Sequence, residues 1–197
     1  MLTHLRPAIT LMLGFTLLTG LAYPLAMTGL AQTLFPAAAD GSLITQGDRV
    51  IGSSLVAQPF AEAAYLHPRP SASDWNAAGT GASNLGPTSA LLVATVAERR
   101  AAWEAETGAA APIDAVTASG SGLDPHVSPQ TALAQADRVA AARGADPAAV
   151  RALIAGRVEG RALWLYGEPR VNVLQANIAL DEGFPMPMPR TDDTAAE

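Results

Sequence analysis

One long uncharged stretch near the start of the chain constrains its fold more than any other feature. No charged residue occurs from Pro7 to Ala39, and residues 8–30 are almost wholly apolar. As a helix rising about 1.5 Å per residue, this inner part covers roughly 34 Å, enough to cross a hydrocarbon core about 30 Å thick. We therefore expect a transmembrane helix over residues 7–34, preceded by a short segment of residues 1–6.

Small residues and one proline interrupt the expected span. Gly14, Gly20 and Gly29 weaken a helix in water, but in a membrane they let a neighbouring helix approach closely. Pro24 removes one backbone donor, and we expect it to kink the helix on its C-terminal side. The composition of the span thus predicts a partner helix within the membrane.

A cleaved secretory signal is the alternative interpretation of the same stretch. Arg6 suits both interpretations, but the apolar run is longer than a signal core of about 7–15 residues. The small residues before Asp40 would also place cleavage late. With Arg6 on one side and Asp40 on the other, the positive-inside rule places residues 1–6 in the cytoplasm and the chain after Ala39 outside it.

The remainder of the chain has the length of one domain with its own core. We expect a single extracytoplasmic α+β domain over residues 35–183, followed by a flexible tail, residues 184–197, rich in proline, methionine and acidic residues. The absence of cysteine excludes disulfides and thiol chemistry. Twelve arginines stand against eighteen acidic residues, giving a net charge of −6, which disfavours a nucleic-acid surface.

Hydrophobic periodicity and turn residues predict the elements of this domain. A hairpin with its turn at Gly47 and a long ordered loop over 67–88 come first. We expect helices beginning at Pro87, at Pro129 after the N-cap Ser128, and at Pro147 after Asp146, which end near Gly108, Gly144 and Ala155. Short strands are predicted over residues 113–117, 163–166 and 171–174, and the last two segments are alternatively a strand and an extended arm.

Candidate chemistry in the sequence is sparse. Ser119, Asp124 and His126 invite comparison with a hydrolase triad, but residues so close in one loop rarely adopt that geometry. Gly120 and Gly122 bracket Ser121 before a helix, although neither phosphate-binding signature is present and the chain has no lysine. The histidines are too scattered to predict a metal site. No catalytic residue is assigned.

Four stretches together resemble one family. They are His67–Ala72 (HPRPSA), Gly79–Thr88 (GTGASNLGPT), Val116–Pro129 (VTASGSGLDPHVSP) and Gly167–Leu174 (GEPRVNVL). With the single N-terminal span, they are similar in content and order to the potassium-transporting ATPase C chain, the accessory subunit of the Kdp-type bacterial potassium pump. The resemblance extends to about Glu182.

This resemblance implies a non-catalytic subunit of a complex in the bacterial inner membrane. The expected partners are a channel-like potassium-translocating chain, a P-type ATPase chain and a small single-span chain. The family is described as a catalytic chaperone that raises the ATP affinity of the ATPase chain. Because the charge pattern places the domain outside the cytoplasm, we favour a structural role for it, with ATP bound elsewhere in the complex.

Two hypotheses for the function therefore assign roles to specific residues. Under a structural role, the loops dock on partners or hold their own shape through Asn84, Gly86, Asp124, His126, Arg170 and Asn172. Under a nucleotide-binding role, phosphate and base would contact Ser119, Gly120, Ser121, Gly122 and Gln130. An exported serine hydrolase using Ser119 and His126 is a more distant third alternative.

Overall fold

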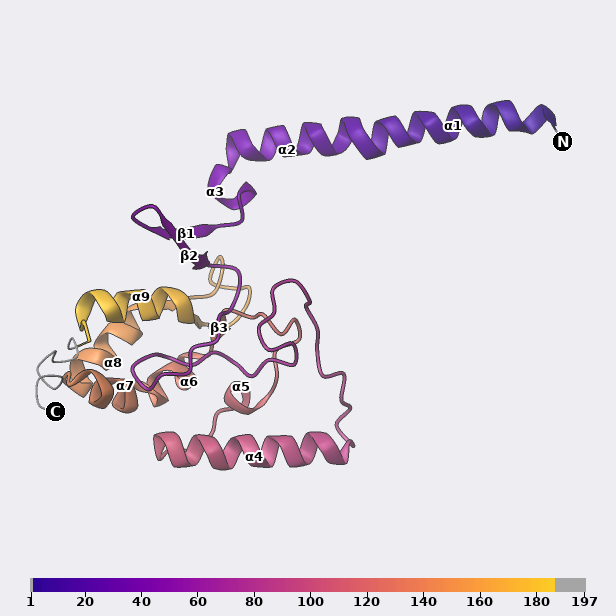
Figure 1. The fold of residues 1–197 in the computed structure, drawn as a ribbon. Helices are drawn as coiled ribbons and strands as arrows, with labels where there is room; N and C mark the ends of the chain where they lie inside the picture. Colours follow the sequence, from indigo (N-terminus) through magenta and orange to yellow (C-terminus); the bar gives the residue numbers. More distant parts are fainter. Residues whose placement is uncertain (1, 187–197) are drawn as a thin grey trace, which may run out of the picture. The chain divides into compact units, whose positions relative to one another are not determined.

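A computed structural model describes residues 2–186 and divides the chain into two compact units. The first unit ends at Ser53 and the second begins at Ser54. An apolar N-terminal helix is followed by a mixed helix and strand domain (Figure 1), which confirms the expected α+β class.

The first unit is dominated by one continuous apolar helix. After a 3-10 turn, η1 (Leu2–His4), it consists of α1 (Leu5–Leu17), a π-helical turn η2 (Leu18–Ala22) and α2 (Tyr23–Leu34). The whole helix has 30 residues with a mean hydropathy of 1.7, and none of its apolar window is buried. Its length and composition suit a membrane span, and it contains the predicted residues 7–34.

The π-helical irregularity of this helix lies directly before Pro24, and the kink expected from Pro24 stays a prediction. Pro24 lacks an N–H, and a proline ring crowds the carbonyl four residues earlier. That residue is Gly20, which lies within η2. The wider π-helical turn accommodates the proline, and α2 then continues without a break to Leu34.

A hairpin follows the span. The short helix α3 (Pro36–Ala39) leads into β1 (Leu43–Gln46) and β2 (Arg49–Ser53), which pair antiparallel. Gly47 occupies the turn with φ +60°, a conformation that glycine adopts readily. The predicted hairpin and its turn residue are confirmed.

The core of the second unit lies between a small sheet and the C-terminal helices. Strands β3 (His126–Val127), β4 (Val158–Glu159) and β5 (Arg170–Asn172) form an antiparallel sheet in the order β3–β5–β4. Helices α6 (Pro129–Ala134), α7 (Ala136–Arg143), α8 (Pro147–Gly156) and α9 (Val173–Gly183) surround the core (Figure 1). Fully buried Val139, Val150, Ile154, Val171 and Leu180 are its centre.

The predicted caps set most of these helix boundaries. Ser128 accepts the N–H of Thr131, and Asp146 accepts the N–H of Ala148. Gly144 ends α7 with φ +63°, and Gly108 ends α4 (Ala90–Thr107) with φ +67°. Helix α4 begins three residues after the predicted Pro87, because Ser89 is its N-cap.

Three predicted strands and one predicted helix differ from the structure. Residues 113–117 form a helical turn, α5 (Ile113–Val116), and residues 163–166 form a turn. Only the start of 171–174 is a strand, because Asn172 caps α9 and begins a helix that sequence patterns missed. The helix predicted from Pro129 to Gly144 is divided at Gln135.

The predicted tail begins inside the folded unit. Phe184 packs against the core, and its carbonyl accepts a 2.9 Å bond from Nη1 of Arg143. Residues 187–197 lie outside the described residues.

Candidate functional site

A self-bonded loop positions Asp124, one of the residues that line the candidate site. Ser119 is only 2% exposed, and its hydroxyl accepts the N–H groups of Gly122 (3.0 Å) and Asp124 (3.3 Å). The same hydroxyl lies 3.2 Å from the hydroxyl of Ser121. Gly122 has φ +72°, the left-handed region. The loop between α5 and β3 is therefore shaped by its own polar groups.

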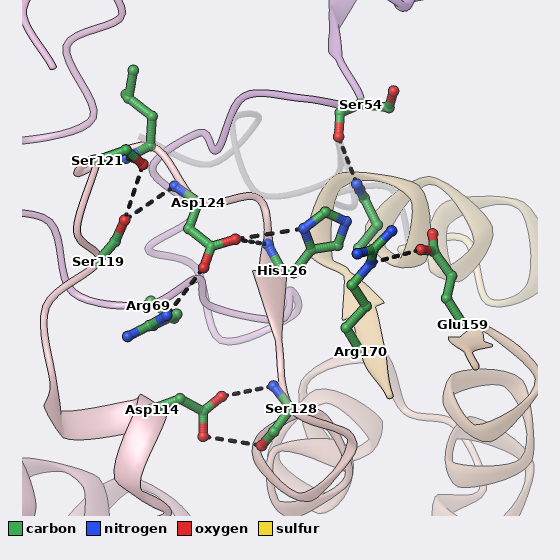
Figure 2. A network of polar contacts seen from close by, with 12 residues as sticks. Ser54, Arg69, Asp114, Ser119, Ser121, Asp124, His126, Ser128, Glu159 and Arg170 are labelled. Atoms are coloured by element: carbon green, nitrogen blue, oxygen red, sulfur yellow. Dashed lines mark hydrogen bonds and ion pairs between the residues drawn. The ribbon is translucent and has the colours of Figure 1, made fainter. Parts of the chain in front are cut away.

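Asp124 connects this loop to a distant part of the chain (Figure 2). One carboxylate oxygen accepts a 3.0 Å bond from Nη1 of Arg69, and the other accepts the N–H of His126 at 3.0 Å. The second oxygen also lies 3.5 Å from Nδ1 of His126. Asp124 thus holds the Arg69 guanidinium and the His126 imidazole beside its own loop.

Strand β5 contributes Arg170 to the lining of the candidate site. Nε of Arg170 donates to Glu159 on the adjacent strand at 2.9 Å, and both side chains are exposed. Asn172 is buried; its oxygen accepts the N–H of Gln175, and its Nδ2 donates to the Ser54 carbonyl at 2.8 Å. Asn172 shapes the backbone, whereas Arg170 faces solvent.

A third carboxylate, Asp114, joins two elements at the base of the candidate site. Asp114 accepts the N–H of Ser128 at 2.6 Å and the hydroxyls of Ser128 and Thr131 at 2.9 and 2.6 Å. Figure 2 shows the first two of these bonds joining α5 to the start of α6. Because Ser128 is also the N-cap of α6, one carboxylate secures a cap and two elements together.

Residues of these elements line an open cleft of about 460 Å³. Its charged or titratable lining residues are Arg69, Asp114, Asp124, His126, Glu168 and Arg170. Three predicted site residues, Asp124, His126 and Arg170, therefore come together from two sequence motifs. Alternating positive and negative side chains suit a polar protein surface better than a single small ligand.

The other predicted docking residues lie away from this lining. Asn84 is exposed and has φ +52°, and the carbonyl of Gly86 accepts the N–H of Ser89 just before α4. They belong to the loop that leads into α4, so the structure separates the predicted docking residues into two places.

The candidate nucleotide-binding residues do not form one lining. Ser119 is buried, whereas Gly120, Ser121 and Gln130 are exposed, with Gln130 in the first turn of α6. The N–H of Gly122 is already bonded to Ser119.

The residues of the proposed hydrolase triad do not form a triad. The hydroxyl of Ser119 contacts Ser121 and not His126, and the imidazole of His126 faces Asp124. Among residues 2–186, no group of three potential metal ligands is found.

Sequence reasoning missed the residues that place Arg69 in the cleft. The segment before Arg69, residues 63–67, is held by buried or partly buried side chains of α7, α9 and Gln135. Arg138 and Arg143 donate to the carbonyls of Ala63 and Ala64 at 2.6 and 2.7 Å. Gln135 bonds both backbone groups of His67. The sequence signal that could have indicated them is the presence of amide and arginine residues on helix faces that are otherwise apolar, namely Gln135, Arg138, Arg143 and Asn177.

Comparison with known proteins identifies the family. The family model described as "K+-transporting ATPase, c chain" matches residues 5–182. The potassium-transporting ATPase KdpC subunit of Cereibacter sphaeroides is 64% identical over 181 residues, covering 92% of this chain and 98% of that protein. The KdpC subunit of Rhodospirillum rubrum is 56% identical over 191 residues, with 94% and 99% coverage. That of Methylorubrum populi is 52% identical, with 92% and 98% coverage.

The match spans the apolar helix, the cleft and α9, so it concerns the whole described architecture. The chain therefore belongs to the K+-transporting ATPase c chain family, and it is a membrane-anchored, single-pass accessory subunit of the Kdp potassium-transporting ATPase complex.

Proposed function

We propose that this subunit stabilises the assembly of the potassium pump by docking its polar cleft on the potassium-translocating subunit. In this proposal residues 1–6 lie in the cytoplasm, residues 7–34 span the inner membrane and residues 35–183 form one extracytoplasmic domain. The P-type ATPase subunit and the small single-span subunit complete the complex. Any gain in the ATP affinity of the ATPase subunit follows from assembly, without a nucleotide on this chain.

The observation that carries the proposal is the convergence of Asp124, His126 and Arg170 on one open cleft. Arg170 and Glu159 are both exposed, so their ion pair contributes little to the stability of the fold. Such a pair is free to exchange partners at an interface, where charge complementarity selects the partner.

Charge variants at this pair test the proposal. Arg170→Glu is expected to reduce co-purification of the other pump subunits severalfold, with unchanged amounts of this chain in the membrane. The double variant Arg170→Glu with Glu159→Arg restores an internal ion pair but reverses the surface. If docking requires Arg170 itself, the double variant stays defective.

Arg151→Glu is the matched control, because Arg151 forms a similarly exposed pair with Asp137 outside the cleft. Full recovery of the complex with Arg170→Glu would contradict the docking proposal. Recovery in the double variant alone would assign Arg170 a purely structural role.

Labelling of single cysteines tests the topology, since the chain has no cysteine of its own. Ala152 is exposed on α8 and Thr3 precedes the span. We expect a membrane-impermeant maleimide to label Ala152→Cys in intact cells and Thr3→Cys only after lysis. The reverse pattern would place the domain in the cytoplasm.

The competing proposal is a regulator that binds ATP through Ser119, Gly120, Ser121, Gly122 and Gln130. Equilibrium dialysis of the purified full chain with ATP separates the two proposals. Saturable binding that is lost in Ser121→Ala would support the nucleotide-binding role, and absence of binding would remove it.

A further inference from the structure

The turn between β4 and β5 exposes four consecutive large apolar side chains. Leu163 is 82% exposed, Trp164 93%, Leu165 71% and Tyr166 64%. These are among the most exposed large apolar residues in the second unit, and we refer to residues 162–166 as the apolar turn. Burial of such side chains away from water is favourable, so their joint exposure marks a surface with a missing partner.

The backbone of the apolar turn satisfies most of its own polar groups. The N–H of Ala162 donates to the Tyr166 carbonyl at 2.8 Å, and the N–H of Tyr166 donates back at 2.9 Å. The N–H groups of Trp164 and Leu165 donate to the carbonyls of Arg161 and Ala162, each at 3.2 Å. A backbone with most of its donors already bonded leaves few of them unpaired when it enters an apolar medium.

Charged residues close the base of the turn. Arg161 donates to Glu168 at 2.8 Å, and Gly167 takes φ +82° between the turn and this pair. Residues 157–170 contain three arginines and two glutamates, whereas the whole chain has a net charge of −6. The turn therefore combines an apolar tip with a base that is locally positive.

This combination matches the interfacial region of an anionic bilayer. Tryptophan and tyrosine concentrate at the level of the lipid headgroups, where one part of the ring is apolar and another is wet. Arg161 and Arg170 are paired with Glu168 and Glu159, and Arg157 leaves the base with a net positive charge that favours anionic lipid phosphates. The chain already carries a membrane anchor that ends at Leu34, and residues 35–53 connect it to the second unit. That connection spans at most roughly 70 Å, which keeps the unit at high effective concentration near the bilayer.

We propose that the apolar turn, Ala162–Tyr166, is a second membrane contact that inserts into the headgroup region of the bilayer to which the chain is anchored. The observations favour lipid over a protein partner because the tip is a short, highly exposed turn with most of its backbone donors bonded internally, on a chain anchored in a membrane. The proposal does not require the docking role of the cleft, although Glu168 and Arg170 at the base of the turn also line that cleft. It holds on whichever side of the membrane the second unit lies.

Site-directed spin labelling of the full chain in lipid nanodiscs tests this proposal. The nanodiscs contain phosphatidylethanolamine and phosphatidylglycerol and no other pump subunit. A nitroxide is attached to Leu163→Cys or, as a control, to Ala152→Cys on the exposed face of α8. Power saturation then compares collisions with oxygen, which partitions into lipid, and with a water-soluble nickel chelate.

We expect the ratio of oxygen to nickel collisions to be severalfold higher at residue 163 than at residue 152. Adding Trp164→Asp should return the ratio at residue 163 to the control value, because a charged residue opposes insertion. Equal, water-like ratios at both positions would overturn the proposal. So would a water-like ratio in the lone chain that becomes shielded only when the other pump subunits are present, since that result assigns the turn to a protein contact.

Discussion

Asn177 of α9 bonds both backbone groups of Leu66, a residue 111 positions away in the chain. The N–H of Leu66 donates to Oδ1 of Asn177 at 2.8 Å, and Nδ2 of Asn177 donates to the Leu66 carbonyl at 3.0 Å. Both residues are almost fully buried. The Asn177 amide thus satisfies both buried backbone groups of Leu66, which lies outside any strand.

Asn177→Leu should destabilise the second unit by about 2–5 kcal/mol, since each buried backbone group left without a partner costs about 1–3 kcal/mol. Urea unfolding of the full chain in mild detergent, followed by tryptophan fluorescence, measures the change. Gln175→Leu is the matched control on the same helix, because Gln175 is exposed. Equal stability of the two variants would show that the paired bonds to Leu66 contribute little.

Gly122→Ala should destabilise the self-bonded loop by about 2 kcal/mol or more. A Cβ at Gly122 would lie 2.2 Å from the hydroxyl of Ser73 and 2.8 Å from the Gly81 carbonyl, at φ +72°. Gly120→Ala is the control, because nothing lies within 4 Å of its Cβ position. The midpoint of thermal unfolding of the full chain reports both variants, and a comparable midpoint for the two would refute this account of the loop.

Asp114→Ala should cost about 2–4 kcal/mol, because it removes three hydrogen bonds to a charged acceptor and leaves a buried Thr131 hydroxyl without that partner. Urea unfolding measures this loss, with Asp137→Ala in the exposed pair with Arg151 as the control. A loss no larger than that of the control would mean that the N-cap at Ser128 suffices to hold α6.

The free energy of unfolding should also decrease as the pH is lowered, because of His67. Burial lowers the pKa of His67, as does the nearby Arg138 guanidinium, against weaker opposing effects of the Glu62 carbonyl and the Glu106 carboxylate. The unfolded chain therefore takes up this proton first as pH falls below about 6.5. The free energy of unfolding should decrease between that pH and the lower pKa of the folded state.

Urea unfolding at pH 7.5 and pH 5 checks this prediction. The loss on acidification should be smaller in His67→Gln than in the natural chain. An identical loss in both proteins would show that other groups carry the pH dependence.

Gly29→Leu tests the span. Nothing lies within 4 Å of the Cβ position of Gly29, so the chain itself has room for the larger side chain. We expect normal insertion but weaker co-purification of the other pump subunits, because a small residue permits close packing of membrane helices. Leu25→Ile, on an exposed part of the same helix, is the control. Unchanged recovery of the complex would exclude this face as a packing surface.

Local patterns anticipated much of the fold because their causes lie within a few residues. The caps at Ser128 and Asp146 and the left-handed Gly108 and Gly144 depend on backbone stereochemistry at one position. Short apolar runs failed at 113–117 and 163–166, because four or five residues do not distinguish a strand from a helical turn or a loop. The candidate cleft was anticipated only as separate motifs, and tertiary folding joined Arg170 to Asp124 and His126.

By itself, the sequence determined the membrane helix, the hairpin turn and most helix ends, since hydropathy and backbone preference act locally. Tertiary structure alone decided the break at Gln135, whose side chain bonds His67 and the Thr131 carbonyl, and the placement of the segment held by Asn177. The bonds of Gln135 to His67 and of Asn177 to Leu66 join residues 68 and 111 positions apart. Their partners are set by how the whole domain packs, which no local pattern encodes.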